Sequence, residues 1–183
     1  MTDYEMVREK LLFQRYRASE VPSHDAPGVY ALFLTSRPSL PGLVLESDVL
    51  YVGMTESSLG VRNHFSHSHS GFSSPRRTLG ALLREKLKLI ALPRAPGPSL
   101  SNVRNYRFSE DGEKRLVAWM DSYLTYGLCP TNADIRKIED RLIGELKPPL
   151  NLTGWRNPQA GRLKALRRAC RDEASSARER GPA

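Results

Sequence analysis

The chain has 183 residues, of which 28 are Lys or Arg and 20 are Asp or Glu, so its formal net charge is +8. This length suits one domain with short appendages and argues against a two-lobed enzyme. Apolar runs stay far below the roughly 18 residues that cross a bilayer, and no basic-then-apolar leader opens the sequence. The two cysteines are too few for a disulfide framework. We therefore expect a cytoplasmic protein with no membrane partner, whose positive charge favours anionic partners such as nucleic acid.

The first 25 residues predict one helix and a lead-in. Thr2 and Glu5 have the spacing of a capping box, and apolar residues then recur with helical period to about Gln14. A stretch rich in helix breakers, residues 22–27, follows this helix.

Two short apolar runs, residues 28–34 and 48–53, predict buried strands because turn residues bound each of them. The connection at 36–42 is rich in Pro and Gly, so the simplest arrangement is an antiparallel pair with an enlarged loop. Such pairing can bring Tyr30 and Tyr51 together on one pleated face. Core packing with satisfied hydroxyl groups would explain the same two tyrosines.

The region from residue 57 to residue 128 alternates between helices, loops and strands. Ser74 suits the N-cap, and Pro75 the first position, of a helix that ends before Pro93. The other predicted elements are a short helix at 57–65, a polar loop at 66–74, an exposed excursion at 92–100, a strand at 102–108, a helix around 116–120 and a strand at about 123–128.

The helix predicted at about 133–146 carries an acid, Glu139, on its apolar side. Thr131 and Asp134 have capping spacing at the start of this helix. The side chains three or four residues from Glu139 are largely apolar, namely Ile135, Leu142 and Ile143. A carboxylate directed at a core must be paired, protonated or bound to a metal. A structural ion pair with an arginine and a catalytic role both meet this requirement.

Two further polar residues are candidates for a site. Asn151 follows a double proline that fixes the backbone near the end of the Glu139 helix, although a turn residue would also suit this position. Arg62 lies between apolar neighbours, and its planar fork suits a phosphate or the carboxylate of Glu139.

Together these residues resemble the GIY-YIG endonucleases, which include homing endonucleases, some restriction enzymes and the incision subunit of bacterial excision repair. The resemblance covers about residues 26–155 and has five elements in the family's order. These elements are Gly28-Val29-Tyr30, Tyr51-Val52-Gly53, Arg62, Glu139 with Leu142-Ile143 and Pro148, and Asn151.

The resemblance implies an α+β fold, with a small antiparallel three-stranded sheet flanked by helices. It also implies a DNA endonuclease that hydrolyses phosphodiester bonds, with Mg²⁺ or Mn²⁺ held by Glu139 and no small-molecule cofactor. In this scheme Arg62 grips the scissile phosphate and Tyr51 accepts a proton from the attacking water. Tyr30 supports Tyr51 by hydrogen bonding, and Asn151 orients neighbouring groups. A tyrosine has an unperturbed pKa of about 10, so this base needs nearby cationic charge or a metal-activated water.

Further candidates for substrate contact follow Arg62. His64 and His67, which precede His69, would contact phosphate or assist proton transfer if their segment borders the cleft. A zinc site lacks an assured fourth ligand here, so a polar loop is the simpler interpretation. Arg76 and Arg77 are candidates for extending a DNA-binding surface.

The region at 156–183 predicts a basic helix that starts near Asn157-Pro158 and a frayed tail from about Asp172. Residues 156–180 contain eight basic and three acidic side chains, an excess of +5. We expect this excess to give sequence-independent affinity for the DNA backbone. A solvated basic end with no partner is the alternative.

The predicted organisation is an N-terminal helix and lead-in at 1–25, a GIY-YIG-like nuclease domain at 26–155 and the basic extension at 156–183. The predicted function is a divalent-metal-dependent DNA endonuclease. A catalytically inactive nucleic-acid-binding module of the same fold is the alternative. A basic assembly protein that uses the cleft only structurally is a third possibility.

Overall fold

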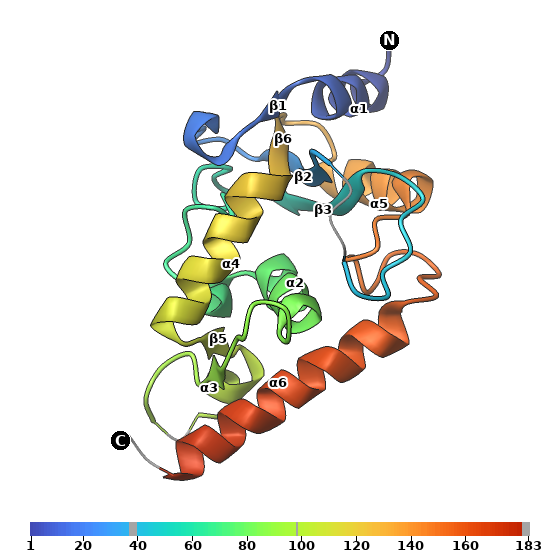
Figure 1. Cartoon of the computed structure of the whole chain (residues 1–183). Coiled ribbons are helices and arrows are strands. Elements are labelled where there is room, and N and C mark those ends of the chain that lie inside the picture. The colour runs from blue at the N-terminus through green and yellow to red at the C-terminus, as the bar shows by residue number, and fades with distance from the viewer. Residues whose placement is uncertain (37–39, 98, 181–183) are drawn as a thin grey trace.

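A computed structural model describes residues 1–36, 40–97 and 99–180. They form a four-stranded antiparallel sheet with helices on both faces (Figure 1). The elements are α1 (Asp3–Phe13), β1 (Arg15–Tyr16), the 3-10 helix η1 (Ala18–Glu20), β2 (Gly28–Leu34), β3 (Val49–Thr55), the 3-10 helix η2 (Ser70–Phe72), α2 (Ser74–Leu83), β4 (Ala91–Leu92), α3 (Leu100–Arg104), β5 (Arg107–Phe108), α4 (Glu110–Tyr123), β6 (Leu124–Pro130), α5 (Ile135–Leu146) and α6 (Ala160–Arg180).

The strand order in the main sheet is β1-β6-β2-β3, with β2 in the middle and β3 at one edge. The three long strands confirm the predicted antiparallel arrangement, but the expected count of three was wrong because β1 adds a fourth strand beside β6. Arg15 holds this short strand in place. Its guanidinium pairs with Asp48 and lies 4.0 Å from the ring centroid of Phe33. A separate two-stranded sheet joins β4 and β5.

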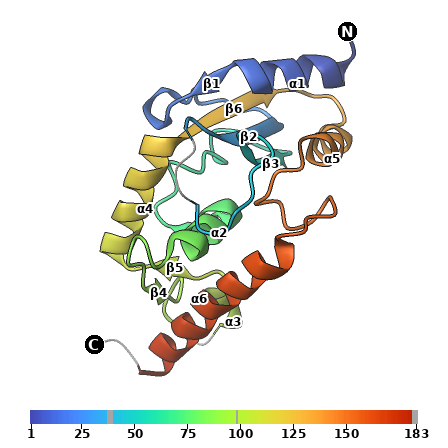
Figure 2. The ribbon, with the colours of Figure 1, turned by 45° about the vertical axis from the view of Figure 1, so that its right-hand side comes forward.

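All seven residues of β2 are buried because both faces of the sheet are covered. Tyr30, Leu32 and Leu34 face a core that includes residues of α2, α4 and α6. The alternate residues of β2 face a second core with α1 and α5. Figures 1 and 2 show α2 between the sheet and α6, which crosses the far end of the molecule. Within the described residues, no helix is long and apolar enough to cross a membrane.

The helices α1, α2 and α5 begin close to the predicted positions, but the N-cap residue of two of them differs from the prediction. Thr2 and Glu5 form the predicted capping box of α1. Ser73, rather than Ser74, caps α2, because the Ser73 side chain accepts from the backbone of Arg76. Asp134 likewise replaces Thr131 as the N-cap of α5.

Two predicted segments were wrong, and a third was right only at its end. Residues 57–65 form consecutive turns instead of a helix, and residues 102–108 contain the end of α3 followed by the short strand β5. The tail does not fray at Asp172, since α6 continues to Arg180. The Glu173 carboxylate anchors this part of α6 to Arg84 and to the backbone N–H of Ala91. Positions 37–39 of the predicted loop, position 98 and positions 181–183 lie outside the described residues.

Candidate active site

Tyr30 and Tyr51 meet on one face of the sheet. The antiparallel register pairs Tyr30 with Gly53 and Leu32 with Tyr51, so the two phenols are diagonal neighbours. Their ring centroids lie 6.2 Å apart. Tyr30 is only 3% exposed, whereas Tyr51 is partly buried. The predicted approach of the two tyrosines is confirmed, and Tyr51 is the more accessible of the two.

Gly53 leaves the space that these two phenols occupy. A Cβ atom at this position would lie 2.5 Å from the Tyr30 hydroxyl oxygen and 2.9 Å from a ring carbon of Tyr51. Glycine inside a strand often marks the close approach of another group. Here the approaching groups are the two tyrosine rings, so the glycine of the second motif has a direct steric role.

Glu139 lies on α5, which packs against the edge strand β3. Its side chain is partly buried, and burial raises the pKa of the carboxyl group. Asp140 raises this pKa further, whereas Arg136 and a hydrogen bond from the backbone of Met54 lower it. Its partial burial agrees with its position on the apolar side of the helix, and a desolvated acid of this kind is a candidate functional group.

A structural ion pair does not explain Glu139. In residues 1–36, 40–97 and 99–180, Glu139 forms no ion pair, and Arg136, one turn earlier, pairs instead with Glu56 at 2.8 Å. The carboxylate is therefore available to a ligand. Mg²⁺ commonly takes one or two protein carboxylates and keeps several waters, so Glu139 fits such an ion. The described residues contain no group of three or more His, Cys, Asp or Glu side chains that could hold a metal.

Arg62 lies in the turns between β3 and η2 and is exposed. Its backbone N–H donates to Leu59 O at 3.1 Å, and its carbonyl accepts from the Tyr126 hydroxyl at 3.0 Å. These bonds hold the main chain, while the guanidinium of Arg62 pairs with no acid among the described side chains. The main chain of Arg62 is thus held in place while its guanidinium is exposed. Arg62 does not lie on the predicted helix.

The charges of Arg62 and Glu139 both act on the two tyrosines. Burial is the largest cause that raises the pKa of Tyr51, and the charge of Glu139 raises it further. A hydrogen bond from Tyr30 and the charge of Arg62 lower it. Burial also raises the pKa of Tyr30 well above its usual range, against the effect of Arg62. The charges of Glu139 and Arg62 thus reach both tyrosines, and both phenols carry their protons at neutral pH.

Asn151 holds the edge of β3 next to Tyr51. Its side-chain amide donates to Val52 O at 2.8 Å and its oxygen accepts from Val52 N at 2.9 Å. The adjacent Leu150 donates its N–H to Leu50 O at 2.9 Å. Asn151 thus behaves like a short additional strand and positions the backbone on one side of Tyr51.

His64 connects Tyr30 to α2. One ring nitrogen, Nε2, lies 3.0 Å from the Tyr30 hydroxyl, and the other, Nδ1, lies 2.9 Å from Ser73 Oγ. The imidazole is 2% exposed, and burial lowers its pKa well below the usual range. His64 is therefore a neutral ring with both nitrogens engaged.

Two directions of donation satisfy this chain of groups, one for each neutral tautomer of His64. With the proton on Nε2, the Ser73 hydroxyl donates to Nδ1 and Nε2–H donates to Tyr30, whose own proton is then free for Tyr51. With the proton on Nδ1, Tyr30 donates to Nε2 and Nδ1–H donates to Ser73 Oγ. In both, Ser73 Oγ accepts from the backbone N–H of Arg76 at 3.2 Å.

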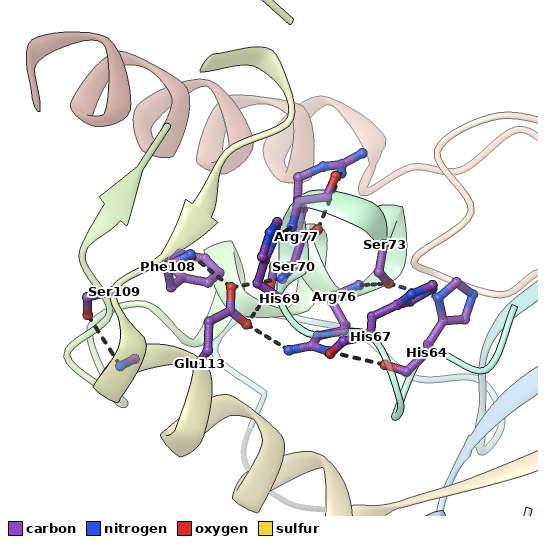
Figure 3. A network of polar contacts seen from close by, with 12 residues as sticks. His64, His67, His69, Ser70, Ser73, Arg76, Arg77, Phe108, Ser109 and Glu113 are labelled. Carbon is purple, nitrogen blue, oxygen red and sulfur yellow. Dashed lines mark hydrogen bonds and ion pairs between the residues drawn. The ribbon is translucent and has the colours of Figure 1, made fainter. Parts of the chain in front are cut away.

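A buried ion pair supports the segment that carries His64 (Figure 3). Arg76 Nη2 lies 2.7 Å from a carboxylate oxygen of Glu113, and Arg76 Nη1 donates to His67 O at 2.6 Å. Glu113 also accepts from the backbone N–H groups of Ser70 and Phe108, at 2.8 and 2.9 Å. This network ties α2 and α4 to the turns that follow Arg62.

The network corrects several predicted substrate contacts. Arg76 is fully buried against Glu113, and Arg77 is 8% exposed and donates to Gly71 O at 2.8 Å, so neither extends a surface. His64 likewise has no free nitrogen for a phosphate. His67 is partly buried, and its buried Nε2 has no hydrogen-bond partner among the described residues.

Sequence reasoning missed Ser73 and Glu113. The Ser73-Ser74-Pro75 order was a usable signal for Ser73, since a proline also occurs at the second helical position, which shifts the cap by one residue. Glu113 carried no such signal. It lies in the first turn of α4, where an acid is favoured by the helix dipole alone.

Comparison with known families gives one match. A family model described as the GIY-YIG catalytic domain matches residues 28–173, a span that contains both tyrosines, Arg62, Glu139 and Asn151 and extends into α6. Comparison with curated proteins and with solved structures found no match.

Proposed function

The chain belongs to the GIY-YIG catalytic domain family, and we propose that it is a divalent-metal-dependent endonuclease that hydrolyses phosphodiester bonds in DNA. One observation carries this proposal. Tyr30 and Tyr51 lie with their ring centroids 6.2 Å apart on the sheet against which the Glu139 helix packs, and neither Glu139 nor the nearby cation Arg62 is in an ion pair within the described chain. Hydrolysis of a phosphodiester requires such a set, because charge must be stabilised while a proton leaves the attacking water.

Each residue has a role that suits its environment. Arg62 is exposed on a fixed main chain, so its fork can hold the scissile phosphate in two-point contact. Tyr51, the more accessible phenol, would accept the proton of the attacking water. Tyr30 would donate to Tyr51 and stabilise its ionised form, and Asn151 keeps the backbone of β3 in register beside it.

Glu139 is the residue that would hold Mg²⁺ or Mn²⁺. When bound, a divalent cation supplies positive charge beside the phosphate and the tyrosines. Glu139 raises the pKa of Tyr51 more than any other neighbouring charge, so neutralising this carboxylate favours ionisation of Tyr51. This effect meets the requirement that a phenol needs help to act as a base at neutral pH.

Cleavage assays with plasmid, branched and single-stranded DNA, in Mg²⁺, Mn²⁺ or EDTA, test the proposal. Wild-type protein should cut at least one substrate with metal and none in EDTA. Glu139→Gln should abolish cleavage and keep DNA binding, whereas Glu9→Gln, an exposed acid on α1, should cut as wild type does. Binding of DNA by wild type without cleavage under every condition would favour the inactive binding module, and equal cleavage by Glu139→Gln would exclude the assigned role of the carboxylate.

A further inference from the structure

A basic hollow of about 290 Å³ lies between α3 and α6. Buried Tyr106 and partly buried Leu152 contribute apolar lining. All the charged side chains that line it are cations, namely Arg104, Lys164, Arg167, Arg168 and Arg171. No carboxylate lines this hollow, although acids pair with arginines elsewhere on the molecule.

The helix α6 gathers four of these cations by its periodicity. Lys164, Arg167, Arg168 and Arg171 are three or four residues apart, so they share one side of the helix. Leu163, Cys170 and Ala174 are buried and hold α6 against the rest of the protein. Arg104, the last residue of α3, completes the hollow from the other side.

The positive charge of the hollow is uncompensated. Arg104, Lys164 and Arg168 form no ion pair within the described residues, and Arg171 has only its neighbour Asp172 at 3.6 Å. Like charges three or four residues apart on a helix repel each other. A bound anion with several negative charges would remove this repulsion.

Arg167 joins the hollow to α2. Its guanidinium donates to Ser74 Oγ at 3.2 Å and Thr78 Oγ1 at 3.4 Å, so α2 holds it in position. Ser73, the N-cap of α2, contacts His64 Nδ1, and His64 Nε2 contacts the Tyr30 hydroxyl. A continuous series of contacts therefore leads from the hollow through α2 to the phenols.

We propose that this hollow binds the phosphodiester backbone of the substrate strand at phosphates beyond the one that is cleaved. The inference rests on the proposed nuclease function for the identity of the polymer. Its chemistry needs only repeated phosphates at a cationic surface, which is the sequence-independent part of DNA recognition. The basic extension at 156–183 would thus contact the DNA backbone through the residues that line this hollow.

Binding of a fluorescent DNA duplex in EDTA, followed by anisotropy at several salt concentrations, tests the proposal. Lys164→Ala/Arg168→Ala should weaken binding about tenfold and reduce the salt slope by about 1.8, the value for two lost phosphate contacts. The matched control Arg156→Ala/Arg180→Ala removes the same charge at exposed positions outside the hollow. It should have a clearly smaller effect on both quantities. Circular dichroism of each variant checks that α6 remains folded.

Equal losses in the two double variants would overturn the proposal, because the effect would then be general charge attraction. A binding assay with inorganic phosphate in place of the duplex tests whether the hollow binds a free phosphate ion instead of the DNA backbone. If inorganic phosphate binds to the hollow and Lys164→Ala/Arg168→Ala leaves the affinity for the duplex unchanged, the hollow is a small-anion site and the proposal fails. Cleavage is measured separately, so a wild type that binds through the hollow without cutting would refute the hydrolytic function alone.

Discussion

The Nε2 atom of His64 lies 3.0 Å from the hydroxyl oxygen of Tyr30, and both side chains are buried. This contact joins the turns after β3 to the central strand of the sheet. Through Nδ1 it continues to Ser73, the N-cap of α2. The orientation of the Tyr30 hydroxyl therefore depends on groups that lie outside both tyrosine motifs.

Ser73→Ala should lower the rate constant of DNA cleavage about tenfold, because the buried Nδ1 of His64 would lose its partner and the imidazole that positions the Tyr30 hydroxyl would be less firmly held. Ser109 offers a matched control, since it caps α4 in the same way by accepting from Gly112 N. Both changes should cost about 1 kcal/mol of stability through the lost cap, but only Ser73→Ala should slow cleavage. Ser73→Thr should restore most of the rate. Equal rates for the two alanine variants, measured with saturating DNA, would contradict the role of Ser73.

The free energy of unfolding should decrease as the pH is lowered, and His64 should contribute to this decrease. Burial lowers the pKa of His64 in the folded protein, so below the unfolded value of about 6.5 the unfolded chain binds a proton that the folded chain excludes. The free energy of unfolding should therefore drop by roughly 1.4 kcal/mol from this group one pH unit below 6.5. Urea unfolding of wild type and His64→Gln between pH 7.5 and pH 5 measures the difference. Parallel pH curves for the two proteins would exclude a neutral buried His64.

Gly53→Ala should impair both stability and cleavage, because the added Cβ would lie 2.5 Å from the Tyr30 hydroxyl oxygen. Overpacking of this kind costs about 1–3 kcal/mol. Gly144→Ala is the matched control, since Gly144 lies inside α5 and a Cβ there meets nothing within 4 Å. That change should stabilise the protein by up to about 1 kcal/mol through helix propensity. Thermal unfolding shows whether Gly53→Ala lowers the stability and Gly144→Ala raises it. A Gly53→Ala variant as stable as wild type would show that the phenols can move apart.

Loss of Glu113 should be the most destabilising of these changes. Glu113→Ala would leave the guanidinium of Arg76, which is fully buried, without its charged partner, at a cost of about 3–5 kcal/mol. Removing the exposed ion pair by Glu56→Ala should leave the free energy of unfolding nearly unchanged. Urea titration compares the two variants. Glu113→Gln keeps an acceptor oxygen for Ser70 and Phe108 and should lose less stability than Glu113→Ala, and a mild effect of Glu113→Ala would show that Arg76 finds another partner.

Local sequence patterns predicted the parts of the site that depend on local structure. Alternation and turn residues placed Tyr30 and Tyr51 on neighbouring strands, and helical period placed Glu139 beside apolar neighbours. Arg76 was misassigned to a surface because its partner Glu113 lies 37 residues away, beyond the reach of any local pattern. The bond between His64 and Tyr30 spans 34 residues and was hidden for the same reason.

The position of β3 at the margin of the sheet has one more consequence. An unprotected outer strand offers its N–H and C=O groups to a strand of another molecule, which is a common route to aggregation. The backbone of Leu50 and Val52 is already occupied by Leu150 and Asn151. Asn151, a residue of the proposed reaction centre, therefore also protects the protein from self-association, so its replacement would lower solubility as well as turnover.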